Sequence, residues 1–347
     1  MAKNSYRVAI VGATGAVGQN IKQLLEKRNF PIKELRLLSS KRSAGTKIKF
    51  MDQEITVQEA APEQFDNINI AFFSAGGAVT KQLADAAIER GAIVVDNTSA
   101  FRMDADVPLV VPEVNPQALD DHKGLIANPN CSTIQMVVAL KPILKNYGLT
   151  NIIVSTYQAV SGAGLAAIDE LKTQIKQYLN DEPMAANILP AGSDKKHYPI
   201  AFNALPQIDV FEDNGYTAEE MKMINETKKI MEQPNLSVAA TCVRLPVVTS
   251  HSESIFIEVE QDNVSVDDIK TVLKDAPGVV LQDDVTTQTY PTPLEAIDQE
   301  DVFVGRIRKD LHNDRGFHLW VVSDNLMKGA ALNTVQIAET LISRKII

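Results

Sequence analysis

The sequence predicts an α/β protein with two domains, and three observations support this fold class. Strand-like and helix-like segments alternate through the first third of the chain, as a doubly wound parallel sheet requires. β-rich stretches are pooled in the middle with helix candidates beside them, which is typical of an α+β domain with a mixed sheet. A last amphipathic segment, residues 325–342, is expected to form a helix that returns to the first domain.

The size of the chain agrees with two hydrophobic cores, because 347 residues with 45% hydrophobic content is long for one domain. We expect residues 1–128 and the C-terminal segment 325–347 to form the first domain. Residues 129–324 then form the second, and each domain can bury a core of its own.

The individual elements follow from apolar runs and from the spacing of apolar residues. In the first third, strands are predicted at residues 7–11, 34–38, 69–74 and 92–96, and helices at 17–27 and 79–90. In the middle, strands are predicted at residues 151–160, 236–244, 254–260, 302–308 and 316–323, and helices at 134–144, 165–178, 218–231 and 266–274. Residues 180–215 are Pro- and Asn-rich and predict a long loop or a dimer arm, and the pattern does not choose between them.

Composition excludes several classes of partner. The formal net charge of −10 argues against nucleic acid or an anionic membrane, because both require clustered Lys and Arg. No apolar run reaches the roughly 18 residues of a membrane span, and no secretory signal pattern follows the first residues. Two cysteines are too few for a disulfide framework, so we expect a cytoplasmic protein with reduced thiols. Paired Cys or His residues at metal-ligand spacing are absent from the sequence, so no metal is expected.

A glycine-rich turn, GATGAVG at residues 12–18, follows the first predicted strand and opens the first predicted helix. Glycines let the backbone turn tightly and approach a pyrophosphate, and the helix N-terminus supplies N–H groups and partial positive charge. The pattern alone is weak, but its placement between strand and helix predicts a Rossmann-type dinucleotide-binding domain. An ordinary glycine-rich turn is the alternative.

The end of the second predicted strand favours NADP over NAD. An NAD site usually places Asp or Glu there to hold the ribose hydroxyls. Here the strand ends in SSKRS, residues 39–43, without a carboxylate. Arg42 and Ser43 suit a 2′-phosphate instead, although a solvated basic loop would look the same.

Cys131 is the candidate nucleophile. It follows Pro129 and Asn130 and precedes Ser132 and Thr133, which is loop and N-cap chemistry before an apolar helix. A helix N-terminus lowers the pKa of a thiol and favours the nucleophilic thiolate. The alternative, a small buried residue, fits the other cysteine, Cys242, in its strand-like run.

A cysteine beside a nicotinamide site indicates acyl chemistry. The thiolate attacks an aldehyde to form a thiohemiacetal, loss of hydride leaves a thioester, and phosphate releases an acyl phosphate. The reverse direction reduces an acyl phosphate to an aldehyde. Either direction also requires a base, an anion clamp and an oxyanion donor.

Several motifs together resemble the aspartate-semialdehyde dehydrogenase family over essentially the full length, in an order and spacing closer to its Gram-positive members. They are GATGAVG at residues 12–18, NPNCST at 128–133, QAVSGAG at 158–164, EEMK at 219–222, and RLPV at 244–247 followed by HSE at 251–253.

The resemblance implies an NADP-dependent, phosphorylating dehydrogenase that interconverts L-aspartyl 4-phosphate and L-aspartate 4-semialdehyde, a step in lysine, threonine, methionine and diaminopimelate biosynthesis. It also implies a homodimer. Cys131 resembles the acyl-accepting nucleophile, His251 the acid/base, and Gln158 the side chain that orients substrate near the thiol. The implied substrate-binding residues, for the α-carboxylate, amine and phosphate, are Arg244, Glu219, Lys222, Arg102, Asn130 and Gln158. The implied cofactor contacts are Gly12, Thr14, Gly15, Ala16, Val17, Arg42, Ser43, Ser161, Gly162 and Asn325.

Without the resemblance, the residues themselves leave simpler interpretations open. Glu219 and Lys222 would be an ordinary exposed helix ion pair. Arg244 could be a surface charge on an edge strand, and Arg102 a loop cation. His251 lies in a Ser- and Thr-rich predicted turn, where histidines are often only solvated.

Three alternative functions remain at this point. N-acetyl-γ-glutamyl-phosphate reductase is similar in fold and logic, but its motif typically reads Pro-Gly-Cys-Tyr, whereas Ser132 and Thr133 follow the cysteine here. Glyceraldehyde-3-phosphate dehydrogenase is more distant. A non-catalytic nucleotide-binding protein on the same fold would be expected to lack Cys131 or His251, and both are present.

Overall fold

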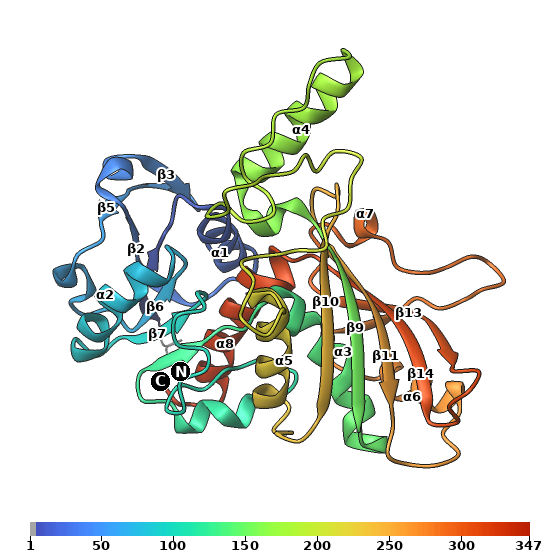
Figure 1. The fold of residues 1–347 in the computed structure, drawn as a ribbon. Helices are drawn as coiled ribbons and strands as arrows, with labels where there is room; N and C mark the ends of the chain where they lie inside the picture. The colour runs from blue at the N-terminus through green and yellow to red at the C-terminus, as the bar shows by residue number, and fades with distance from the viewer. Residues whose placement is uncertain (1–4) are drawn as a thin grey trace. The chain divides into compact units, whose positions relative to one another are not determined.

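The computed structural model describes residues 5–347, which separate into two compact units (Figure 1). The first unit contains residues 5–130 together with Ala330–Ile347. The second unit is Cys131–Gly329.

The first unit is built on a six-stranded sheet in which every pair of neighbouring strands is parallel. Its strand order is β5 (Gln58–Glu59), β2 (Ile32–Ser39), β1 (Tyr6–Val11), β6 (Ile70–Phe73), β7 (Ile93–Asp96), β8 (Leu125–Ala127). The central strands are apolar along their length, since a parallel sheet in a doubly wound fold is covered on both faces. Chain order reverses between β1 and β6, which is where such folds bind their ligands.

Helices α1 (Ala16–Lys27) and α2 (Gly77–Glu89) connect these strands, and a small antiparallel hairpin, β3 (Lys47–Phe50) with β4 (Gln53–Thr56), follows β2. Three short helical turns complete the connections: η1 (Lys41–Ser43), η2 (Pro62–Phe65) and η3 (Pro116–Asp121). The last helix, α8 (Leu332–Ser343), packs against α1, and Arg28 Nη2 lies 2.8 Å from the Glu339 carboxylate. The expected return of the C-terminal helix to the first domain is therefore confirmed.

The second unit contains a mixed six-stranded sheet. Its order is β10 (Ser237–Arg244), β9 (Asn151–Gln158), β11 (His251–Glu258), β14 (Gly316–Ser323), β13 (Val302–Lys309), β12 (Val279–Leu281). Helices α3 (Cys131–Tyr147), α5 (Ala218–Ile230) and α6 (Val266–Lys274) pack on one another and on these strands, and the short α7 (Pro293–Ala296) contacts β14. The outermost strand pairs, β10–β9 and β12–β13, are parallel, and the pairs between them are antiparallel. The predicted mixed sheet is therefore confirmed.

Two local expectations are wrong, and one predicted helix is longer than expected. His251 is the first residue of β11 and not part of a turn, because its backbone pairs with Ser323 of β14. Helix α3 covers the predicted residues 134–144 and is longer at both ends; it tolerates Pro142 because the buried packing of this helix outweighs the one backbone hydrogen bond that proline removes. The segment 325–342 is not one helix: a π-helical turn, η5 (Met327–Ala331), precedes α8, and the Gly329 N–H donates to the Asp324 carbonyl at 3.2 Å.

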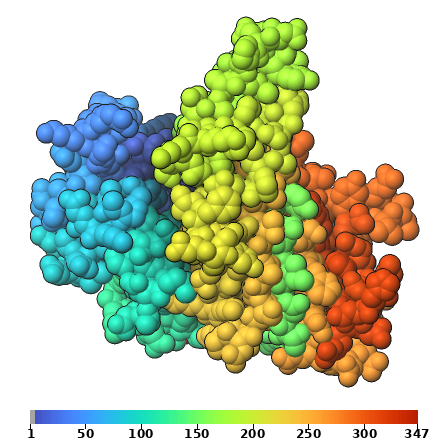
Figure 2. Space-filling view, in the orientation of Figure 1, coloured from blue at the N-terminus to red at the C-terminus, as the bar shows by residue number. Residues whose placement is uncertain are grey.

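Helix α4 (Leu165–Leu179) stands out from the rest of the second unit (Figures 1 and 2). A 3₁₀ turn, η4 (Val160–Ala163), precedes this helix. Residues 180–215 contain no helix or strand beyond isolated bridges, as a long loop requires. Gln174 of α4 holds the loop, because its side chain bonds the backbone of Ala185, Ile200 and Ala201 at 2.7–3.0 Å.

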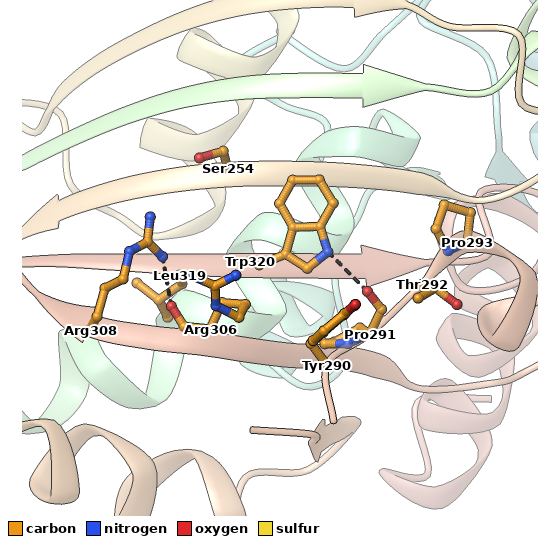
Figure 3. A pocket seen from close by; sticks show the side chains of 9 residues that line it. All are labelled: Ser254, Tyr290, Pro291, Thr292, Pro293, Arg306, Arg308, Leu319 and Trp320. Atoms are coloured by element: carbon orange, nitrogen blue, oxygen red, sulfur yellow. Dashed lines mark hydrogen bonds between the residues drawn. The ribbon is translucent and has the colours of Figure 1, made fainter. Parts of the chain in front are cut away.

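One sheet face of the second unit carries an open pocket of about 440 Å³ (Figure 3). Trp320 of β14 lies in its wall and donates its indole N–H to the Pro291 carbonyl at 3.0 Å. Trp320 pairs with Ser254 of β11, one residue from Glu253, so both side chains point to the face opposite Glu253. None of the helices among the described residues is long and apolar enough to cross a membrane.

Candidate active site

The glycine turn of the first unit has the local geometry that its sequence predicts. Gly12 has φ +91°, and a Cβ there would lie 2.8 Å from the Ser74 backbone. A Cβ on Gly18 would lie 2.2 Å from the Gly12 carbonyl oxygen, so helix α1 can approach β1 only with glycine at that position. Gly15 caps the N-terminus of α1, and Thr14 Oγ1 lies 2.9 Å from Ser39 Oγ.

A pocket of about 360 Å³ opens at this turn, at the carboxyl ends of β1, β2 and β6. Its lining includes Gly12, Thr14, Gly15, Ser39, Ser40, Lys41, Glu59 and Ser74. The pocket lies at the switch point of the sheet, beside free helix N–H groups, and therefore fits a dinucleotide phosphate.

Two predicted 2′-phosphate residues sit beside this pocket rather than in its lining. Arg42 and Ser43 form the rest of η1, and the Arg42 side chain is exposed. Lys41, which the sequence analysis did not single out, lines the pocket itself. Ala16 and Val17 are the first two residues of α1 and follow directly from the turn.

Cys131 is the first residue of α3 and is half-buried. Residues Ser132 to Leu140 are buried, so this helix is fixed in the unit by packing on all sides. A Cβ on Gly329 would lie 2.8 Å from Cys131 Cβ. The backbone of the π-helical turn therefore packs directly against Cys131, and a side chain at position 329 would not fit. Such turns are frequent at functional sites.

Arg244 and Gln158 end neighbouring strands and lie directly opposite each other in the sheet. Arg244 is only 4% exposed, and its Nη1 donates to the Ala159 carbonyl at 2.7 Å and to Gln158 Oε1 at 3.4 Å. Burial lowers the pKa of Arg244, and Glu219 and Cys131 oppose that shift. The arginine therefore lies close enough to the thiol to interact with it electrostatically.

Arg244 is buried even though β10 is an edge strand, so the surface-charge interpretation is wrong. Leu205, from the long loop, pairs with it through two backbone hydrogen bonds of 2.8 and 3.0 Å. This covering segment comes from almost 40 residues earlier in the chain. Local sequence therefore gives no sign that Arg244 is protected from solvent.

His251 is fully buried, and its ring is held by the backbone. The Ala159 N–H donates to His251 Nδ1 at 3.0 Å, while Nε2 is buried with no hydrogen-bond partner among residues 5–347. Burial and the Arg244 charge lower the pKa of His251 well below its ordinary value, and the Ser250 backbone partly opposes them. His251 is therefore neutral at pH 7.

Gly162 marks the point where these groups converge. A Cβ there would lie 2.9 Å from Arg244 Nη1 and 3.4 Å from His251 Nε2. Nearby, Asn325 Oδ1 accepts hydrogen bonds from Ser161 Oγ at 3.1 Å and from the Ser250 N–H at 2.9 Å. The implied cofactor residues Ser161, Gly162 and Asn325 thus lie in the same cluster as His251.

Glu219 and Lys222 do not form an exposed ion pair. Glu219 is 6% exposed, and its carboxylate accepts from Gln158 Nε2 at 3.2 Å and from Lys222 Nζ at 3.4 Å. Lys222 also donates to Asp209 at 2.8 Å. A buried carboxylate linked through Gln158 to a buried arginine is a polar site, not a solvated helix face.

Arg102 and Asn130 belong to the first unit, and both are buried there. Arg102 Nε donates to the Asn128 carbonyl at 2.9 Å, and Nη2 donates to the Asn97 carbonyl at 3.1 Å. This guanidinium is therefore fixed by backbone and is not a mobile loop cation.

Sequence reasoning missed several polar residues of the second unit. Gln135 donates from Nε2 to the His251 carbonyl at 3.4 Å, and Glu253 lies fully buried two residues after His251. The available signal was the position of Glu253, because a charged residue on the buried face of a strand is rare. Gln135 gave no such signal, because a glutamine is unremarkable in any helix. Among the described residues, no group of three His, Cys, Asp or Glu side chains is arranged to hold a metal ion.

The two cysteines are expected to differ sharply in reactivity. Cys242 is fully buried, and burial together with Glu219 raises the pKa of its thiol. Because the thiolate is the nucleophile, iodoacetamide should label Cys131 and leave Cys242 unmodified in the native protein. Peptide mass spectrometry measures both sites, with denatured protein as the positive control for Cys242. Rapid labelling of native Cys242 would contradict this prediction.

Known proteins agree with this arrangement along the whole chain. Residues 7–122 match the family model described as the NAD binding domain of semialdehyde dehydrogenase, and residues 140–328 match its dimerisation domain. The aspartate-semialdehyde dehydrogenase of Bacillus subtilis is 66% identical over 334 residues, which cover 96% of each chain.

Solved structures give the same result. Aspartate semialdehyde dehydrogenase II of Vibrio cholerae, complexed with ASA, has a TM-score of 0.92 and 46% identity, covering 98% of this chain and 99% of that one. The enzyme of Candida albicans, solved with NADP, has a TM-score of 0.75 and 28% identity, covering 99% of this chain and 100% of that one.

These matches confirm the resemblance, the enzyme class and NADP as the cofactor. They support a homodimer acting on a small molecule, and nothing in them indicates nucleic acid or a membrane. The chain belongs to the aspartate-semialdehyde dehydrogenase family, whose members catalyse the NADP-dependent reductive dephosphorylation of aspartyl phosphate in amino-acid biosynthesis.

Proposed function

We propose that this chain reduces L-aspartyl 4-phosphate to L-aspartate 4-semialdehyde, reversibly, through a thioester on Cys131. The pathway context is lysine, threonine, methionine and diaminopimelate biosynthesis. The observation that carries the proposal is the convergence of Arg244 and His251 on Gly162 in the unit whose helix α3 begins at Cys131. A nucleophile, a neutral imidazole and a fixed anion clamp are the parts that acyl transfer requires.

The proposed reaction begins when the Cys131 thiolate attacks the acyl carbon of the substrate and phosphate leaves, which forms the thioester. NADPH, when bound, would supply the hydride that reduces the thioester. His251 would act at Nε2: because Nδ1 accepts from the Ala159 N–H, the neutral ring carries its proton on Nε2. That proton can be shared with the oxygen of the thiohemiacetal as it forms, and stays with the ring as the C–S bond breaks and the aldehyde leaves. The helix N-terminus and Arg244 favour the thiolate at the start and at the end of the cycle.

The remaining polar residues would bind the substrate. Arg244 suits the α-carboxylate, because a guanidinium fork binds carboxylates bidentately. Glu219 suits the amine, and Gln158, bonded to both residues, would orient the acyl group. The family resemblance further assigns Lys222, Arg102 and Asn130 to substrate binding.

Two groups of residues are proposed to contact the cofactor. Its pyrophosphate suits the turn formed by Gly12, Thr14, Gly15, Ala16 and Val17. Ser161, Gly162 and Asn325 would contact its nicotinamide end, and Arg42 and Ser43 its 2′-phosphate. Most of these contacts lie in residues 1–128 with 325–347, which we assign as the NADP-binding domain; residues 129–324 are assigned as the catalytic and dimerisation domain.

Arg42 provides a direct test of the 2′-phosphate contact. Arg42→Ala should weaken NADP binding about 10-fold, the scale of one charge-assisted contact near the surface, and leave NAD binding unchanged. Titration of both cofactors measures the two dissociation constants. Lys47→Ala, which removes an exposed lysine of the β3–β4 hairpin, is the matched control. An equal loss for NAD and NADP would place the 2′-phosphate elsewhere.

We also propose a cytoplasmic homodimer. The sheet face that carries the pocket of Figure 3 has half-exposed aromatic side chains, including Tyr157 and Trp320 with ring centroids 5.5 Å apart. Exposed apolar sheet surface within a dimerisation domain supports this face as the contact between two copies.

The proposed function is tested by following NADP reduction in the presence of phosphate. Aspartate semialdehyde should be oxidised rapidly, and the reaction should stop when phosphate is omitted. N-acetylglutamate semialdehyde is the discriminating alternative substrate. A higher kcat/KM for the acetylated compound would replace the proposed substrate with that of N-acetyl-γ-glutamyl-phosphate reductase.

A further inference from the structure

Two rows of side chains cross the second sheet on the same face. Arg244 and Gln158 are register partners, and two residues earlier along β10 and β9 Cys242 and Thr156 are also partners. On β11, Thr156 is opposite Glu253. Because residues two apart in a strand share a face, Glu253 lies on the same face as His251, in the row immediately beneath the proposed catalytic groups.

Glu253 is a buried acid that the proposed mechanism does not use. Its side chain is fully buried, and neither carboxyl oxygen has a hydrogen-bond partner among residues 5–347. Burial raises the pKa of Glu253 well above its ordinary value, which the adjacent Gln135 side chain partly opposes. Burial therefore favours the neutral acid, which has one O–H to donate. A buried polar group without a hydrogen-bond partner lowers the free energy of unfolding, so the presence of Glu253 in the buried part of a strand indicates a role.

Gln135 connects this acid to both reacting residues. It is four residues after Cys131, and therefore lies on the same side of α3 one turn along the helix. Its Nε2 donates to the His251 carbonyl, while its Oε1 is buried without a partner. The amide oxygen of Gln135 lacks a donor, and the carboxyl O–H of Glu253 lacks an acceptor.

We propose that Glu253 is a positioning residue, whose carboxyl group pairs with the Gln135 amide and holds the first turn of α3 against the start of β11. This pair sets the separation between Cys131 and His251. The inference rests on the proposed function, because it takes those two residues as the reacting groups. Glu253 itself touches neither substrate nor cofactor.

Two substitutions at Glu253 separate hydrogen bonding from simple packing. Glu253→Gln keeps the size and a donor for the Gln135 oxygen, and should retain kcat within about threefold. Glu253→Met keeps the volume but removes the donor. It should lower kcat about 10- to 100-fold, because small displacements of reacting groups cost up to about 100-fold, and it should leave KM within about twofold. A purely structural role would not produce rescue by the amide together with this kcat–KM split.

A double-mutant cycle tests whether the two side chains act as one unit. Gln135→Met should lower kcat as Glu253→Met does, and the double variant should be no worse than the poorer single variant. Ile255→Ala, on the same face of the same strand, is the matched control: it should lower the melting temperature and keep kcat. If Glu253→Met fails to fold, Gln135→Met tests the same pair, because it removes the partner on helix α3 and its kcat can be measured in the same way.

Wild-type kcat in a folded Glu253→Met or Gln135→Met variant would overturn the inference, as would losses that simply multiply in the double variant. A Glu253→Gln enzyme as slow as Glu253→Met would also overturn it. These failures are distinct from a failure of the proposed function, which would appear as substantial turnover in Cys131→Ser or as activity without phosphate.

Discussion

Cys131→Ser is expected to lower turnover by at least about 10³-fold in either direction. A serine hydroxyl at this position remains protonated, because its pKa is far above that of a thiol, and its ester would be a poorer substrate for hydride addition than a thioester. The reason is chemical rather than structural, because serine is isosteric with the cysteine at the start of α3. NADPH oxidation or NADP reduction followed at 340 nm measures the effect.

Two controls isolate the thiol in that experiment. NADP binding by Cys131→Ser should be unchanged, because the pocket at the glycine turn belongs to the first unit and Cys131 to the second. Cys242→Ala should retain activity within about twofold, since that buried thiol is unreactive. Loss of activity in Cys242→Ala, with full activity in Cys131→Ser, would reverse the assignment of the nucleophile.

His251→Asn is expected to lower kcat by about 10²- to 10⁴-fold while KM changes little, because general acid–base catalysis by one side chain contributes on this scale. Asparagine keeps a polar group near Nδ1 that can accept from the Ala159 N–H, but it cannot exchange a proton. His318→Asn is the matched control, because that histidine is part-buried and bonded to Asp310 in the strand region away from the cluster. Equal losses in both variants would indicate general destabilisation instead of catalysis.

The pH dependence of the wild-type enzyme carries the same information. Burial and Arg244 lower the pKa of His251, so the neutral ring persists below pH 6.5. Activity that depends on the neutral ring is therefore present above this lowered pKa and is lost only as the pH falls through it. The pH profile of kcat/KM should show its acidic limb below pH 6.5, and His251→Asn should lack that limb. A limb at or above pH 6.5 would contradict a buried, Arg244-shielded imidazole.

Features that depend on residues close together in the chain could be predicted from the sequence alone. The glycine turn was identifiable because Gly12 and Gly18 answer local requirements, a positive φ and a close approach of helix to strand. Cys131 at a helix start was identifiable because loop and capping residues precede an apolar helix. Strand and helix alternation then predicted the parallel sheet, since its βαβ units are local in sequence.

The contacts among the buried polar residues could not be predicted in this way, because they join segments that are far apart in the chain. Arg244 is buried because Leu205 pairs with it from the long loop, and His251 begins a strand because Ser323 pairs with it from β14. Glu253 and Gln135 come together from a strand and a helix more than 100 residues apart. The physical reason is that burial, desolvation and pKa depend on what packs around a side chain. Those neighbours are brought together by strand register and helix packing over long distances in the chain, which local pattern does not encode.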